Sequence, residues 1–189
     1  HPNSRRQRQM CIRDRATHIS AAAGAFTWML AEKVRFGKPS ALGIVTGMVA
    51  GLGTITPASG FVGPGGALII GISAGLVCFY ATIYIKQRLK IDDSLDVFPV
   101  HGVGGILGTL LTAVFASNAL GVFSGQEDIV ISSQLGVQAI GVVATVVYTG
   151  TVTWFILKLT DVVVGNRVDE DQEQEGLDLV AHNERGYDL

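Results

Sequence analysis

The sequence predicts an all-α membrane protein, and composition, charge placement and the length of its apolar runs are the three observations behind that prediction. Hydrophobic residues make up 48% of the 189 residues and charged residues only 16%. The 24 glycines are well above the average usage of roughly 7%. Residues 1–15 carry five Arg and one Asp, residues 165–189 carry eight acids and two Arg, and the body between them has no net charge. A neutral apolar body between two charged ends is typical of a multi-span membrane protein.

Apolar runs of suitable length predict five membrane-spanning helices. A helix needs about 20 residues to cross the hydrocarbon core. The apolar runs at about 40–58, 66–85 and 97–116 reach that length, while the first, at 16–31, is shorter and the last, at 134–164, is longer. Clusters of glycine and proline mark breaks at 37–40, 56–60 and 63–66. The predicted helices lie at about 16–36, 40–58, 66–86, 93–116 and 134–164.

Basic residues predict how these helices are oriented, since Lys and Arg concentrate in short cytoplasmic loops. Between residues 16 and 164 they follow the first, third and fifth predicted helices: Lys33, Arg35, Lys38, Lys86, Arg88, Lys90 and Lys158. The loops at 56–65 and 117–133 have none. Alternation of sides therefore agrees with five spans and places the acidic tail, residues 165–189, in the cytoplasm. We expect the protein in the cell membrane.

The first 15 residues have no apolar period and abut an apolar run that begins abruptly at Ala16. A signal peptide would also have a basic head, but no clear small-residue cleavage signature follows here. We therefore predict that residues 1–15 are a non-native or disordered head on a chain truncated at its N-terminus.

Small residues recur every four positions along three of the predicted helices. The repeats are Gly43/Gly47/Gly51, Ala67/Gly71/Gly75 and Gly104/Gly108. Because lipid is as apolar as leucine, close backbone approach supplies much of the packing between helices in a bilayer. The pattern predicts a compact bundle and says nothing of a substrate.

The fourth predicted helix carries the candidate site. Asp92, Asp93 and Asp96 stand at its start, where carboxylates accept bonds from unpaired N–H groups and lie at the positive end of the helix dipole. His101 lies roughly 12 Å deeper than Asp93 at the rise of an α-helix, which argues against a shared metal centre. An ionisable group inside an apolar helix is a functional hypothesis by default, and a packing histidine is the alternative.

Pro99 and Gly102 flank His101 and predict that the helix is kinked or widened there. A neutral imidazole lining a narrow path can accept and donate a hydrogen bond or relay a proton. The sequence contains no catalytic Ser/His/Asp set, metal cluster or phosphate loop, so we expect no enzymatic activity, no metal and no cofactor.

Several stretches together resemble the ammonium transporter (Amt/Mep/Rh) family. They are Gly37-Lys38-Pro39-Ser40, Thr56-Pro57-Ala58-Ser59-Gly60-Phe61-Val62, Gly65-Gly66-Ala67-Leu68-Ile69-Ile70-Gly71, Asp92-Asp93-Ser94-Leu95-Asp96-Val97-Phe98-Pro99-Val100-His101-Gly102 and Glu175-Gly176-Leu177-Asp178. The resemblance runs in order from about Ala16 to the C-terminus, and its specificity lies in the whole set. It implies an eleven-helix protomer, usually trimeric, whose first ten helices form two inverted repeats around a pore. This chain matches helices seven to eleven and the cytoplasmic tail.

The resemblance also implies roles for individual residues. His101 matches the second member of the family's pair of pore histidines, and the first member belongs to the part that this chain does not match. Val97, Tyr80 and Val49 match positions that line or flank the pore, although relatives can have a larger indole at the position of Tyr80. Asp93 matches an acid near the cytoplasmic end of the pore that is mainly structural.

For the tail, the resemblance implies regulation. In the family this segment packs under the trimer, and some members are blocked from the cytoplasm by a PII-type signal protein. Retention of the family pattern favours an ordered regulatory tail here, at Glu175, Gly176, Leu177, Asp178 and Tyr187.

The function implied is transport of ammonium or ammonia across the bilayer through a hydrophobic pore with a histidine pair, of which this chain supplies one member. We expect the segment alone to be inactive, and we expect no interaction with nucleic acid. Two alternatives remain at this point: an ammonium sensor built on the same fold, and a helical membrane scaffold that transports nothing.

Overall fold

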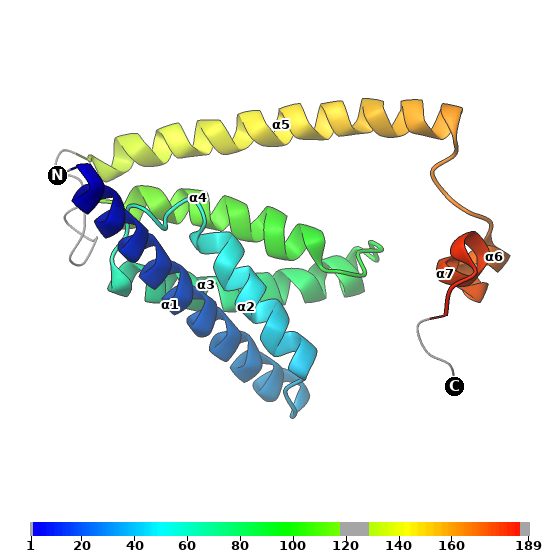
Figure 1. Ribbon diagram of the computed structural model, residues 1–189, viewed down its shortest axis with the longest axis horizontal. Helices are drawn as coiled ribbons and strands as arrows, with labels where there is room; N and C mark the ends of the chain where they lie inside the picture. The colour runs from blue at the N-terminus through cyan, green and yellow to red at the C-terminus, as the bar shows by residue number, and fades with distance from the viewer. Residues whose placement is uncertain (1, 118–128, 186–189) are drawn as a thin grey trace. The chain divides into compact units, whose positions relative to one another are not determined.

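The computed structural model describes residues 2–117 and 129–185 (Figure 1). The chain divides into two compact units, residues 1–142 and 143–189, and each is considered by itself. The helices of the first unit are α1 (Pro2–Phe36), α2 (Ala41–Ile55), α3 (Pro64–Ile83), the π-helix η1 (Tyr84–Arg88), the π-helix η2 (Phe98–Val103) and α4 (Gly104–Phe115). A long helix, α5 (Ile131–Val163), runs on into the second unit, which also contains α6 (Glu170–Glu175) and α7 (Leu177–His182).

The corner between α1 and α2 follows from its sequence. Gly37 takes a positive φ of 83°, which ends α1, and Ser40 caps α2 by accepting a hydrogen bond from the N–H of Gly43 at 2.8 Å. The N–H of Ser40 in turn donates to Glu32 Oε2 at 2.7 Å, so a carboxylate of α1 satisfies a donor at the start of α2. These contacts join two consecutive helices into an antiparallel pair.

Helices α1, α2 and α3 contact one another pairwise, and small residues form the contact layer. The hydroxyl of Ser20 on α1 donates to the carbonyl of Gly51 on α2 at 2.9 Å, and both residues are buried. A Cβ added at Gly71 would stand 2.8 Å from the Cβ of Ala23, and one added at Gly75 would stand 2.8 Å from the carbonyl oxygen of Gly24. The close packing predicted from the small-residue repeats is therefore confirmed for α2 and α3.

Two hydrophobic clusters lie on either side of this layer. One joins the start of the apolar part of α1 to the end of α2, the start of α3 and the end of α4, through Ala16, Ile55, Ala58, Val62, Ala67, Ile70 and Phe115. The other consists of Trp28, Ala31, Ala50, Cys78, Phe79 and Val100. The second cluster includes a residue of η2, and so ties the histidine-bearing helix to the bundle.

An all-α membrane fold is confirmed at the level of class. Three helices in the described part of the chain are long and apolar enough to cross a bilayer: residues 64–88, 98–115 and 131–163. The apolar helix α2 is shorter, with 15 residues. The full set of five spans stays a prediction.

The boundaries differ from the predicted ones in two places. Helix α1 begins at Pro2 rather than at Ala16, so residues 2–15 continue it in a helical conformation; their non-native origin stays a prediction. The fourth helix begins at Val97 instead of residue 93, because Asp93–Asp96 form a turn closed by the N–H of Asp96 donating to the carbonyl of Asp93.

Candidate functional site

His101 lies in the π-helix η2, one turn after the start of the fourth helical segment at Val97. Because residues 93–96 form a turn instead of the first turn of that helix, His101 lies closer to the helix start than the roughly 12 Å predicted from Asp93. Pro99 is the second residue of this π-helix, in the first turn, where its missing N–H costs no helix bond, and α-helix resumes at Gly104. The N–H of Gly104 donates to the carbonyl of His101. The widening predicted from Pro99 and Gly102 is thus confirmed, and it falls at the one intramembrane histidine of this helix.

Asp93 caps the helix that carries His101. Its Oδ1 accepts a hydrogen bond from the N–H of Val97 at 2.8 Å, and its Oδ2 accepts one from the N–H of Phe98 at 2.9 Å. Both donors belong to the first turn, where no intrahelical acceptor exists. The capping role predicted for the acids at this helix start is therefore confirmed for Asp93.

Asp96 has a different role that the sequence did not reveal. It adopts a positive φ of 56°, and its Oδ1 lies 2.7 Å from Lys86 Nζ of η1. The side chain of Asp96 is 17% exposed and that of Lys86 is 37% exposed, so the ion pair is partly shielded from water. The ion pair connects the turn before the histidine-bearing helix to η1, which directly follows α3. Asp92 is exposed.

The predicted pore residues come from three elements that contact one another. Val97 precedes His101 by one helical turn, and both side chains are exposed, Val97 by 52%. Tyr80 on α3 is 56% exposed, and its ring lies 5.3 Å from that of buried Phe79 in an edge-to-face arrangement. Val49 on α2 is partly buried and packs against the cluster that includes Val100. Val97 and Tyr80 are thus exposed and Val49 is partly buried, on elements that contact one another.

Gly53 on α2 shows how closely α2 approaches His101. A Cβ added at Gly53 would lie 3.9 Å from His101 Nδ1 and 3.7 Å from the carbonyl oxygen of Val100. Gly53 is one turn beyond Val49, so both lie on the face of α2 that is directed at η2. This close approach could not be read from the sequence, because 48 residues separate the two positions.

Helix packing behind His101 also includes two polar side chains that the sequence analysis did not single out. Thr54 on α2 and Cys78 on α3 are both completely buried. A Cβ added at Gly104 would lie 2.9 Å from Thr54 Oγ1 and 3.3 Å from Cys78 Sγ. No sequence signal links these three positions, since each sits in an apolar run of its own.

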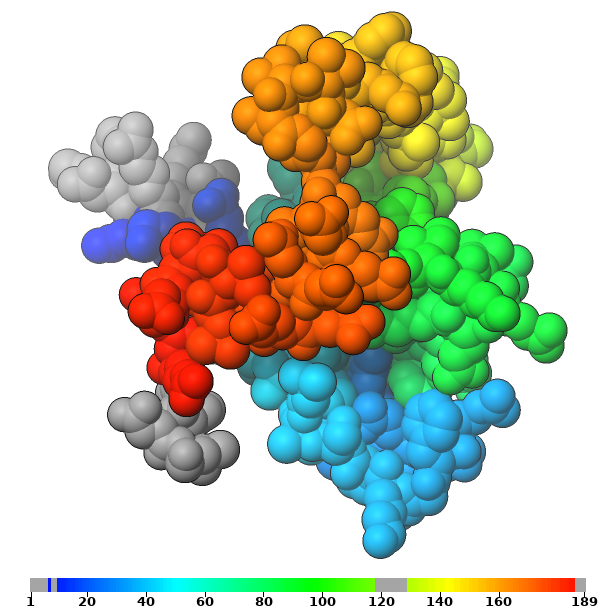
Figure 2. All heavy atoms as spheres, turned by 90° about the vertical axis from the view of Figure 1, so that its right-hand side faces the viewer, coloured from blue at the N-terminus to red at the C-terminus, as the bar shows by residue number. Residues whose placement is uncertain are grey.

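The acidic tail forms two short helices. Glu175 ends α6, and Leu177 and Asp178 begin α7. Gly176 between the two helices adopts a positive φ of 103°. Figure 2 shows this segment in orange and red. Tyr187, the remaining residue of the predicted regulatory set, lies outside the described residues.

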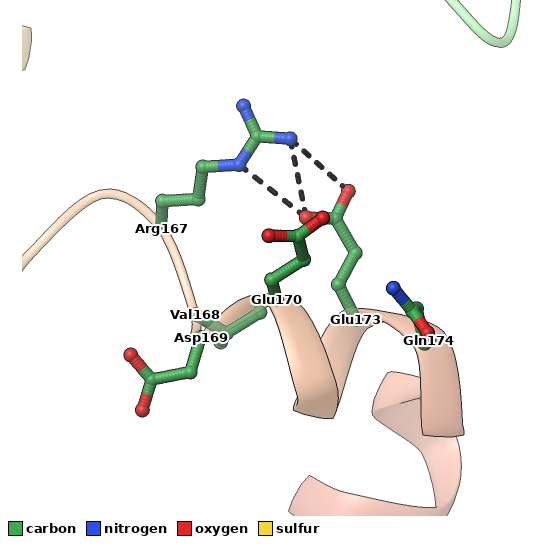
Figure 3. Close-up of a pocket in the computed structure, with 6 residues that line it drawn as sticks. All are labelled: Arg167, Val168, Asp169, Glu170, Glu173 and Gln174. Atoms are coloured by element: carbon green, nitrogen blue, oxygen red, sulfur yellow. Dashed lines mark hydrogen bonds and ion pairs between the residues drawn. The ribbon is translucent and has the colours of Figure 1, made fainter.

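Arg167 and Glu173 hold the start of the tail together. The guanidinium donates to both carboxylate oxygens, with the Nη2 atom 3.1 and 3.2 Å from them, whereas Asp169 points away from this pair (Figure 3). Both side chains are well exposed, so the ion pair orders the turn and contributes little stability.

Chemically, the site combines hydrophobic walls with one imidazole that can donate and accept a hydrogen bond. Within residues 2–117 and 129–185, no group of three or more His, Cys, Asp or Glu side chains is placed to hold a metal ion. Three helices long and apolar enough to cross a bilayer, one of which carries an ionisable histidine, define an integral membrane protein and are typical of transporters and channels.

The chain belongs to the Ammonium Transporter Family, whose sequence profile matches residues 3–187. It is 42% identical over 180 residues to a putative ammonium transporter of Methanothermobacter thermautotrophicus, covering 92% of this chain and 43% of that protein. It is 38% identical over 177 residues to an ammonium transporter of Bacillus subtilis, covering 90% of this chain and 43% of that protein. The chain thus spans less than half the length of these relatives.

Solved structures of ammonium transporter relatives resemble this chain. The crystal structure of Saccharomyces cerevisiae Mep2 superposes with a TM-score of 0.73 at 34% identity, covering 82% of this chain and 37% of that one. A structure described as a Sensor Amt Protein superposes with a TM-score of 0.80 at 31% identity, covering 92% of this chain and 42% of that one. The fold and family resemblance predicted from the sequence motifs is confirmed.

Proposed function

We propose that the protein containing this chain conducts ammonium nitrogen across the membrane, and that His101 supplies one of two imidazoles in its pore. The observation that carries the proposal is an exposed imidazole in the π-turn at the start of a helix that is long and apolar enough to cross a membrane. Family membership and relatives with transporter names support the same reading over an enzymatic one.

The chemistry of such a path favours ammonia over a bare cation. Moving an unpaired charge into a dry apolar tunnel is very costly, whereas a neutral molecule that can hydrogen-bond crosses at far lower cost. Val97, Tyr80 and Val49 would exclude water, and His101 would exchange hydrogen bonds with the nitrogen or relay its proton. Potassium has no proton to lose, so a path of this kind rejects it despite its similar size.

The test replaces His101 by Ala and by Asp in the full-length transporter and measures methylammonium uptake and potassium entry. We expect a changed uptake rate or a loss of discrimination against potassium. The matched control is His18→Ala, since His18 is an exposed imidazole on α1. Uptake and discrimination that stay unchanged in both His101 variants would refute the pore role.

The complete protein would have eleven helices, with this chain providing helices seven to eleven, which are most of the second inverted repeat and the last helix, and the cytoplasmic tail. Basic loops after the first, third and fifth helices support this orientation. Protease accessibility of the 165–189 tail in inside-out vesicles, compared with right-side-out vesicles, checks it. Because the other repeat would supply the partner histidine, purified chain in liposomes should not take up methylammonium; uptake there would contradict this division.

We further propose that the full-length protein is a homotrimer whose tail is regulatory. The break at Gly176 between two short helices, together with Glu175, Leu177 and Asp178, supports an ordered tail, and a PII-type protein is the candidate partner. Deleting residues 165–189 should change transport while the trimer persists in mild detergent. A sensor on the same fold remains the competing function, and zero uptake by the intact, folded protein would favour it.

A further inference from the structure

Thr54, like Thr82 on α3, lacks the hydrogen bond to its own helix that several threonines of the described helices make. Six others bond their hydroxyl to the carbonyl four residues earlier in their own helix: Thr46, Thr56, Thr109, Thr112, Thr149 and Thr160. Thr54 is completely buried, and its Oγ1 bonds no carbonyl of its own helix but interacts with the thiol of Cys78 on α3. A buried hydroxyl usually finds a partner, so the orientation of this one requires a reason.

The hydroxyl of Thr54 is directed at Gly104. The place that a Cβ of Gly104 would take lies 2.9 Å from Thr54 Oγ1 and 3.3 Å from Cys78 Sγ, so side chains from α2 and α3 occupy it together. One turn further along α4, a Cβ at Gly108 would meet the carbonyl group of Thr54, with its carbon at 2.8 Å. The end of α2 is thus seated against two successive small residues of the helix that follows η2.

Gly104 is coupled directly to His101. Three residues separate them, and the N–H of Gly104 donates to the His101 carbonyl at the end of η2. A displacement of Gly104 therefore moves the peptide group of His101, because the π-turn between them is short and hydrogen-bonded. A Cβ added at the neighbouring Gly53 would lie 3.9 Å from His101 Nδ1, so a small movement of η2 changes the distance between the imidazole and α2.

We propose that Thr54, assisted by Cys78, is a positioning residue for His101: the two side chains fill the space over Gly104 and so set the depth and rotation of the histidine-bearing helix. The proposal rests on the pore function of His101 and adds to it the residues that fix the ring in place. Neither Thr54 nor Cys78 touches the substrate path in this scheme.

A size exchange across the contact tests the proposal in the full-length transporter. Gly104→Ala inserts a methyl group 2.9 Å from Thr54 Oγ1 and 3.3 Å from Cys78 Sγ, and Thr54→Ala removes the nearer of the two atoms. We expect Gly104→Ala to lower the maximal rate of methylammonium uptake at least tenfold at equal protein abundance. The double variant should recover to within about threefold of the unaltered protein.

Two controls separate positioning from general damage. Gly60→Ala adds the same methyl group where nothing lies within 4 Å, and it should leave uptake unchanged. Thr46→Ala, which alters α2 away from Gly104, should not rescue Gly104→Ala. The ratio of ammonium to methylammonium uptake supplies a further readout, since loss of folded protein lowers both rates equally, whereas a displaced imidazole changes the ratio.

The outcomes are distinguishable. Normal uptake by Gly104→Ala, or failure of Thr54→Ala to rescue a folded Gly104→Ala protein, overturns the positioning role while leaving transport intact. Rescue by Thr46→Ala as effective as that by Thr54→Ala also overturns it. An unaltered full-length protein that takes up neither substrate would instead refute the proposed function.

Discussion

The contact between α1 and α2 at Gly51 gives the sharpest test of how this bundle is held together. Gly51 has no side chain, and a Cβ there would meet the carbonyl oxygen of Ser20, with the Ser20 carbonyl carbon at 2.9 Å and Ala21 Cα at 3.1 Å. All three are atoms of the α1 main chain, so no side-chain rotation can relieve the contact. Gly51→Ala must therefore push the two helices apart.

The expected cost follows from two opposing terms. Overpacking a close contact typically costs about 1–3 kcal/mol, and a main-chain neighbour places Gly51 in the upper half of that range. Alanine gains about 1 kcal/mol over glycine in helix propensity. Gly51→Ala should therefore be destabilising by about 1–2 kcal/mol. Gly105→Ala on α4, where nothing lies within 4 Å, should instead gain up to about 1 kcal/mol from propensity alone.

The measurement is the unfolding of the chain in mild detergent by added SDS, followed by the fluorescence of Trp28. Trp28 is 3% exposed and belongs to the second hydrophobic cluster, so its environment reports on separation of α1. A Trp154→Phe background removes the other tryptophan. The two variants should differ by about 2–3 kcal/mol, roughly 30-fold or more in the unfolding constant. Equal unfolding free energies of Gly51→Ala and Gly105→Ala would show that the close contact at Gly51 does not stabilise the packing of α1 against α2.

Three further changes test separate contacts by the same assay. Asp93→Ala removes both acceptors at the start of the histidine-bearing helix and should lower the free energy of unfolding by about 1–2 kcal/mol, whereas Asp93→Asn should retain part of the cap. Equal unfolding free energies of the two variants would contradict the capping role. Ser20→Ala loses one interhelical hydrogen bond, worth about 0.6–1.7 kcal/mol in a membrane protein, and no loss would mean that the bond is not formed. Gly37→Ala should cost about 1–2 kcal/mol purely through its φ of 83°, since nothing lies within 4 Å, and Gly37→Asn should cost less.

The features that could be predicted from the sequence are those that local chemistry determines. Pro99 and Gly102 both lie within the π-turn, and Asp93, which precedes the helix, caps it. Small residues at four-residue spacing predicted close packing because the spacing places them on one helix face whatever the partner is. The boundaries were less accurate, since the hydropathy of Asp93–Asp96 does not reveal that these residues form a turn before Val97.

The contacts that could not be predicted depend on which faces of two helices pack against each other. Asp92, Asp93 and Asp96 are similar by sequence, yet one caps a helix and another pairs with Lys86, ten residues away across a turn. The seating of Thr54 on Gly104 joins positions 50 residues apart, and periodicity assigns both only to buried faces. Pairings of this kind follow from the rotation of each helix about its axis, which single-sequence patterns determine only coarsely.

Helix α2 packs against two different helices with its two opposite faces, and this arrangement affects how a variant of the site must be interpreted. Four residues advance about 40° around an α-helix and two advance about 200°, so Val49 and Gly53 lie opposite Gly47 and Gly51. The first pair is directed at η2 and the second at α1. A substitution that separates α2 from α1 therefore also shifts the surface against which His101 rests. Loss of transport assigns a residue to the pore only when the unfolding free energy of the same variant is unchanged.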